Sequence, residues 1–128
     1  MDTQSQSPWP EPITAAAKRV LVVDDDRDIR ELLVELLEGE GYQVSSAENG
    51  EQALLKARLH RPNLILLDLM MPVMSGWRFR AEQAREPSIA AVPVVVISAY
   101  ANDLDVEAFI PKPFPIEDVL EAVHRFAA

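Results

Sequence analysis

Residues 63–76, N-L-I-L-L-D-L-M-M-P-V-M-S-G, predict how the chain folds. The apolar run from Leu64 to Leu67 is typical of a strand covered on both faces, and it ends at the carboxylate of Asp68. Pro72 supplies no backbone donor, and Ser75 is suited to cap the helix that follows Gly76, predicted over about residues 75–85. We therefore expect Asp68 where a buried strand opens into a loop. Such an Asp is either a turn former or helix cap, or part of a site.

The rest of the chain repeats this alternation of strand and helix. We predict strands over residues 18–23, 42–47, 64–68, 92–97 and 108–111, and apolar runs mark most of them. Helical periodicity predicts four helices, whose apolar faces comprise Ile29, Leu32, Leu33, Leu36 and Leu37; Ala53, Leu54 and Ala57; Trp77, Ala81 and Ala84; and Ile116, Val119, Leu120, Val123 and Phe126. Strands that alternate with helices, most of them continuously apolar, predict an α/β fold: a doubly wound five-stranded parallel sheet with helices on both faces.

Composition limits the possible functions. The 128 residues suit one domain over residues 18–128, preceded by a disordered or extended tail over residues 1–17 that contains Trp9. The formal charge of -9 argues against nucleic acid or an anionic membrane as a direct partner. Without cysteine the chain has no disulfide or thiolate site, and no apolar run is long enough to span a bilayer. Since the start also lacks a signal-peptide pattern, we expect a cytoplasmic protein.

Polar residues end the apolar runs: Asp24 and Asp25, Asp68, Ser98, and Lys112. In a doubly wound sheet, sites lie at the carboxyl ends of the strands, so these side chains are expected to converge. Converging carboxylates repel one another unless a cation joins them, and oxygen ligands alone favour Mg²⁺ or Mn²⁺. Ser98 and Lys112 suit the oxygens of a phosphoryl group. Asp68 is the candidate nucleophile, which would form an acyl phosphate.

Four motifs, in this order, resemble those of the CheY-like response-regulator receiver domain: V-L-V-V-D-D-D at 20–26, L-I-L-L-D-L-M-M-P-V-M-S-G at 64–76, V-V-V-I-S-A at 94–99 and P-K-P-F at 111–114. The resemblance extends from residue 18 to the end of the sequence. It implies a flavodoxin-like fold with sheet order 2-1-3-4-5. It also implies that a sensor histidine kinase or a histidine phosphotransfer protein phosphorylates Asp68.

The resemblance assigns a role to each residue of the expected metal site. It implies that Asp25 and Asp68 bind Mg²⁺ together with the main-chain carbonyl of Met70. Asp24 would act largely through water.

The same resemblance implies that Ser98 and Lys112 bind the oxygens of the acyl phosphate and that the Lys112–Pro113 peptide bond is cis. Phe109 stands at the switch position where the family often has tyrosine, so the switch would be Ser98 and Phe109, without a hydroxyl on the ring. The thirteen residues between Ser98 and Lys112 are too few for the usual fourth helix. We therefore expect a shortened or missing fourth helix and weak protection of residues 100–107.

The leading functional hypothesis is a phosphorylation-operated signalling module of a two-component system or phosphorelay. It would catalyse only its own phosphoryl transfer and autodephosphorylation, and would signal through a downstream protein target or self-association. No output domain follows the last predicted helix, so a stand-alone receiver is expected. One alternative is a constitutive protein-binding domain that phosphate does not switch. A Mg²⁺-dependent phosphohydrolase is disfavoured, because it would need an acid where this chain has Met70. An FMN site is disfavoured because no phosphate-binding loop follows the first strand. His60 and His124 are expected on the surface, not as phosphodonors.

Overall fold

The computed structural model describes residues 17–100 and 104–127. Its strands are β1 (Arg19–Val23), β2 (Gln43–Ala47), β3 (Leu64–Leu67), β4 (Val94–Ser98) and β5 (Ala108–Pro111). Its helices are α2 (Arg27–Gly39), α3 (Gly50–His60), α4 (Gly76–Ala84) and α5 (Ile116–Phe126). The expected tail lies outside the described residues apart from Ala17. None of the helices in this part of the chain has the length and apolar character needed to cross a membrane.

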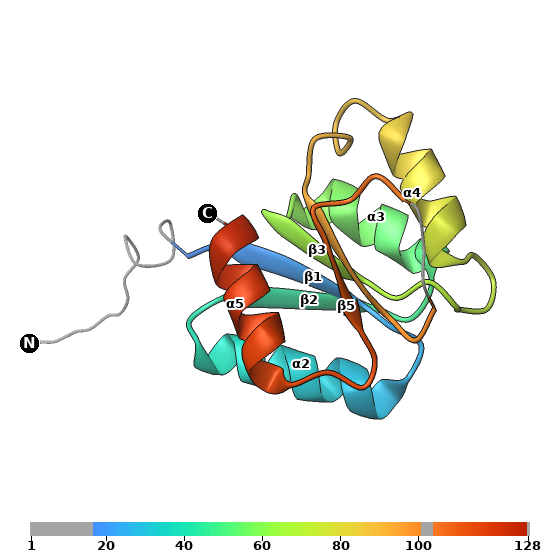
Figure 1. Cartoon of the computed structure of the whole chain (residues 1–128). Coiled ribbons are helices and arrows are strands. Elements are labelled where there is room, and N and C mark those ends of the chain that lie inside the picture. Colours follow the sequence, from blue (N-terminus) through green and yellow to red (C-terminus); the bar gives the residue numbers. More distant parts are fainter. Residues whose placement is uncertain (1–16, 101–103, 128) are drawn as a thin grey trace, which may run out of the picture.

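The strands form one parallel sheet in the order β2-β1-β3-β4-β5 (Figure 1). This confirms the predicted doubly wound fold and its 2-1-3-4-5 order. Helices α2 and α5 cover one face of the sheet, where Leu33, Leu37 and Val123 are buried, and α3 and α4 cover the other, where Ala57 and Phe79 are buried (Figure 1). The direction of winding reverses between β1 and β3, so the carboxyl ends of these two strands flank the place where sites form in such folds.

The connection from β4 to β5 contains no helix among its described residues, which confirms the expected loss of the fourth helix there. Glu107 accepts a hydrogen bond from the N–H of Val94 at 2.7 Å, and Arg80 donates to the carbonyl of Asp105 at 3.2 Å. These contacts tie residues 104–107 to β4 and α4. Residues 101–103 lie outside the described part, so the weak protection expected for residues 100–107 stays a prediction.

The predicted buried face of α4 was wrong. Ala81 and Ala84 are exposed and Trp77 is half-buried, whereas Phe79 and Gln83 are fully buried. Burying Phe79 removes far more apolar area from water than burying an alanine, so the helix is turned to place this ring against the sheet. The Gln83 amide follows it one turn later and donates to two main-chain carbonyls of the segment before β4, at 2.9 and 3.0 Å.

The apolar faces predicted for α2 and α5 were too wide. Leu33 and Leu37 are buried in α2, but Leu32 is 42% exposed. In α5, Val119 is buried but Ile116 is 39% exposed. These outer positions lie at the edges of the helical stripes, where the sheet no longer covers them.

Candidate functional site

Four strands end in polar residues at one edge of the sheet. Asp24 follows β1, Asp68 follows β3, Ser98 is the last residue of β4, and Lys112 follows β5. The N–H of Asp24 donates to the last carbonyl of β2 at 3.1 Å, and the N–H of Asp68 donates to the last carbonyl of β1 at 2.9 Å. The interstrand hydrogen bonds thus continue one residue past β1 and β3, which brings the carboxylates of Asp24 and Asp68 together.

Three carboxylates form a cluster at this edge. Asp24, Asp25 and Asp68 each offer one oxygen, and these oxygens lie within 4.8 Å of one another. Asp24 and Asp68 are 2% and 6% exposed, whereas Asp25 is open to solvent. Two carboxylates of the cluster are therefore buried in the protein, and an ion could reach the cluster from the side of Asp25. Such a set of hard oxygen atoms fits Mg²⁺.

Lys112 reaches into the same cluster. Its Nζ lies 2.7 Å from Oδ2 of Asp24 and 3.4 Å from Oδ2 of Asp68. Burial by itself would lower the pKa of Lys112, but the two carboxylates outweigh burial and raise the pKa above its usual value of 10.5. Burial raises the pKa of Asp24, and the hydrogen bond from Lys112 opposes this rise. The lysine is therefore a fixed positive charge between two carboxylates. Its peptide bond to Pro113 is cis, as predicted.

The other predicted site residues lie around this cluster. Ser98 is fully buried, its Oγ accepts from the N–H of Tyr100 at 3.2 Å, and its carbonyl accepts from the N–H of Lys112 at 2.9 Å. Met70, in the loop after β3, has a side chain that is 49% exposed. Phe109 pairs with Val96, two pairs further from the cluster than Ser98, and is 39% exposed.

Two residues that support the site were not identified from the sequence. A Cβ on Gly76 would lie 2.2 Å from the carbonyl oxygen of Asp68 and 2.8 Å from Cα of Leu69. Gly76 also donates its N–H to the carbonyl of Leu69 at 2.8 Å, so α4 begins directly against the backbone of Asp68. Arg30 donates to the carbonyl of Asp24 at 2.9 Å. The one signal in the sequence was a glycine at the first position of a helix, where larger residues are normally tolerated.

Known proteins share this arrangement of sequence and fold. The response regulator receiver domain matches residues 20–124. The transcriptional regulatory protein PdtaR of Mycobacterium tuberculosis is 36% identical over 118 residues, which cover 85% of this chain and 56% of PdtaR. The chain thus spans about half the length of this relative. The polar-differentiation response regulator DivK of Brucella anthropi is 31% identical over 117 residues, which cover 85% of this chain and 95% of DivK.

Solved structures agree with the sequence relatives. The chemotaxis protein CheY4 of Vibrio cholerae superposes with a TM-score of 0.80 at 28% identity, over 87% of this chain and 99% of CheY4. The range that the family model matches contains β1 apart from Arg19, the strands β2 to β5, and all four strand ends that build the cluster. The chain therefore belongs to the response-regulator receiver family, the receiver domains of two-component signalling systems.

Proposed function

We propose that Asp68 accepts a phosphoryl group from a histidine kinase or a histidine phosphotransfer protein, and that the phosphorylated domain signals through contacts with a protein partner. The observation that carries this proposal is the convergence of Asp24, Asp25 and Asp68 within 4.8 Å, with the Lys112 ammonium in contact with two of them. A structural role alone would not require three carboxylates to crowd together at the edge of a sheet.

The proposed reaction is a displacement at phosphorus. A carboxylate oxygen of Asp68 attacks the phosphorus of a phosphohistidine, a P–O bond forms and the P–N bond breaks. The leaving imidazole nitrogen retains the electron pair and takes up a proton. Lys112 and the hydroxyl of Ser98 would donate hydrogen bonds to the oxygens of the transferred group, because both side chains stand at the strand ends beside Asp68. Hydrolysis of the acyl phosphate by water would reset the domain.

Receiver domains bind Mg²⁺ at an acidic site, and the cluster fits this ion because all its ligands are oxygens. Asp25 and Asp68 would hold Mg²⁺ together with the carbonyl of Met70, and Asp24 would act through water. When bound, the ion would neutralise the negative charge of the carboxylates and of the incoming phosphoryl oxygens. Asp25 is suited to direct contact because its side chain is exposed beside the two buried carboxylates.

The phosphodonor protein would dock on an apolar groove beside Lys112. This groove has a volume of 540 Å³ and is lined by Ile29, Leu32, Ala99, Lys112, Pro113, Phe114 and Ile116. It adjoins the charged site, so a partner helix that covers it would bring its histidine close to Asp68. We expect Leu32→Glu to slow phosphotransfer from a partner protein but not phosphorylation by acetyl phosphate. Leu55→Glu, at another exposed leucine, is the matched control and should affect neither reaction.

The phosphorylation site can be mapped directly. The full chain is incubated with acetyl phosphate and Mg²⁺, the adduct is reduced with borohydride, and the modified residue is located by mass spectrometry. Modification is expected at Asp68 in the wild type and in Asp26→Asn, a control that changes a carboxylate outside the cluster. Modification that persists in Asp68→Asn would contradict the assignment. No modification of the wild type, with Mg²⁺ bound, would favour constitutive protein binding instead.

A further inference from the structure

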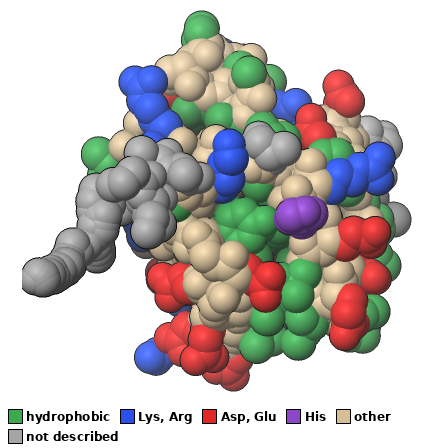
Figure 2. All heavy atoms as spheres, turned by 90° about the vertical axis from the view of Figure 1, so that its left-hand side faces the viewer, with side chains coloured by type: hydrophobic (Ala, Val, Ile, Leu, Met, Phe, Trp, Pro, Cys, Tyr) green, Lys and Arg blue, Asp and Glu red, His purple; other side chains and the backbone are tan. Residues whose placement is uncertain are grey.

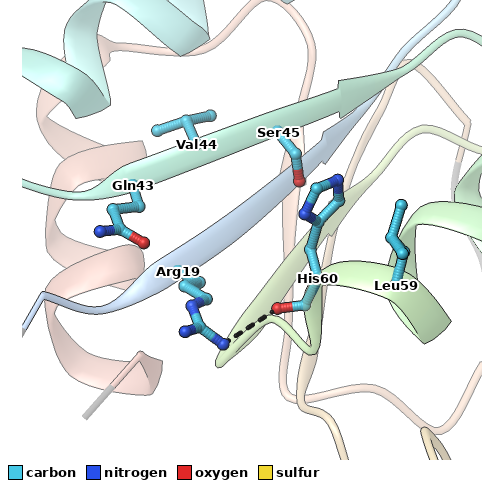
Figure 3. A pocket seen from close by; sticks show the side chains of 6 residues that line it. All are labelled: Arg19, Gln43, Val44, Ser45, Leu59 and His60. Atoms are coloured by element: carbon cyan, nitrogen blue, oxygen red, sulfur yellow. Dashed lines mark hydrogen bonds between the residues drawn. The ribbon is translucent and has the colours of Figure 1, made fainter. Parts of the chain in front are cut away.

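A second hollow lies at the opposite end of the sheet from the carboxylate cluster. It has a volume of 390 Å³ and is lined by Arg19, Gln43, Val44, Ser45, Leu59 and His60 (Figure 3). Arg19 and Gln43 are the first residues of β1 and β2, and His60 is the last residue of α3. Arg19 donates to the carbonyl of His60 at 3.2 Å, which joins the start of β1 to the end of α3 (Figure 3). We call this hollow the amino-end pocket.

The lining of the amino-end pocket combines one apolar wall with basic and polar groups. Leu59 forms the apolar wall and is 72% exposed, so a docked group could cover it. The guanidinium of Arg19 and the imidazole of His60 stand across from the side chains of Gln43 and Ser45 (Figure 3). An aromatic ring could lie against Leu59, and a carboxylate could accept hydrogen bonds from the guanidinium of Arg19 on the other side of His60 (Figure 3).

Charge is unevenly distributed over the end of the molecule at which β1 begins. In Figure 2, Asp and Glu side chains gather mainly over the lower half of this face, where α2 lies, and hydrophobic side chains are exposed between the charged groups. The pocket thus presents the basic side chains of Arg19 and His60 on a chain whose formal charge is -9. An acidic ligand that carries an aromatic ring suits this pocket better than it suits the acidic surface over α2.

We propose that the amino-end pocket binds the segment P-W-P-E-P, residues 8–12, of the same chain. Residues 1–17 contain two acids, Asp2 and Glu11, and no Lys or Arg, so their charge complements that of Arg19. Trp9 offers a ring that could lie against Leu59, and Glu11 offers a carboxylate for Arg19. The three prolines of this segment restrict its backbone, so it loses less conformational entropy on docking than an ordinary tail would.

The position of the tail makes this contact easy to form. Residues 1–17 join the sheet directly before Lys18, and Arg19 is itself part of the pocket lining. Trp9 is ten residues before Arg19. Ten residues in the extended polyproline II conformation span about 30 Å. A tether of this length gives an effective concentration in the millimolar range. Even a contact of millimolar intrinsic affinity would then be occupied in about half of the molecules.

The test follows the exposure of Trp9 by acrylamide quenching in the full chain carrying Trp77→Phe, which leaves Trp9 as the single tryptophan. Half occupancy predicts a quenching constant about twofold lower than in the same chain with Leu59→Glu. Leu55→Glu changes another exposed leucine of α3 outside the pocket and should leave the constant unchanged. ¹⁹F NMR of fluorotryptophan-labelled wild type repeats the measurement without the Trp77 substitution. Equal quenching with and without Leu59→Glu would overturn the proposal. So would protection that disappears on dilution, because the segment would then occupy the pocket of a second copy.

Discussion

Gly76→Ala should both lower the free energy of unfolding of the domain and distort the carboxylate site. The added methyl would lie 2.2 Å from the carbonyl oxygen of Asp68 and 2.8 Å from Cα of Leu69. Both neighbours are backbone atoms, so rotation of a side chain cannot relieve the clash, and α4 or the loop after β3 must move. Overpacking of this kind costs about 1–3 kcal/mol, and contact with backbone on two sides favours the upper value. A loss of about 3 kcal/mol corresponds to a fall in Tm of about 12 °C or more for a domain of this size.

Gly39→Ala is the matched control, because a Cβ there would meet no atom within 4 Å. Alanine is the better helix former, so the free energy of unfolding of this variant should rise by about 0.5–1 kcal/mol. Thermal unfolding followed by circular dichroism measures both changes, and titration calorimetry measures Mg²⁺ affinity, which should fall in Gly76→Ala alone because the backbone of Asp68 has moved. Equal melting temperatures for Gly76→Ala and the wild type would refute the close approach of α4 to Asp68.

Three further outcomes are expected. Val73 has a φ of 67° and is 76% exposed, so Val73→Gly should raise the free energy of unfolding by about 1 kcal/mol, and a lower denaturant midpoint would contradict this. The raised pKa of Lys112 means that its stabilising contribution is full below its usual value of 10.5 and is lost as the pH rises through the raised pKa. The difference in unfolding free energy between wild type and Lys112→Met should therefore shrink above pH 10.5; a constant difference would count against the contact with Asp24. Asp25→Asn should weaken Mg²⁺ binding about tenfold or more in calorimetry, whereas Asp26→Asn, whose amide oxygen can still cap α2, should not; equal losses would refute the division of roles.

The strand ends could be predicted from the sequence because their signals are local. The apolar runs of β1, β3 and β4 mark buried parallel strands, and each stops at or before a polar residue, as Leu67 is followed by Asp68. A doubly wound sheet brings the carboxyl ends of its strands to one edge, so Asp24, Asp68 and Lys112 were expected together before any distance was known. The short connection before Lys112 likewise predicted the loss of a helix.

The contacts that shape the site depend on tertiary packing and left weaker signals. The close approach of Gly76 to Asp68 follows from where α4 packs, which no spacing in the sequence specifies. The face of α4 was mispredicted because Ala81 and Ala84 fit a helical stripe as well as Phe79 does, and only the space beneath the helix decides between them. The preference of Lys112 for Asp24, at 2.7 Å against 3.4 Å for Asp68, depends on side-chain positions that the sequence does not specify.

Solution NMR of the full chain with Mg²⁺, before and after addition of beryllofluoride, tests the central claim most directly. Beryllofluoride stands in for the phosphoryl group on an aspartate. We expect Mg²⁺ to shift the amide signals around Asp25 and Asp68, and beryllofluoride to produce a second set of signals that extends to Ser98 and Lys112. Asp68→Asn should abolish the second set. A wild type that binds Mg²⁺ but shows no response to beryllofluoride, or a response that persists in Asp68→Asn, would contradict the assignment of Asp68 as the phosphoryl acceptor.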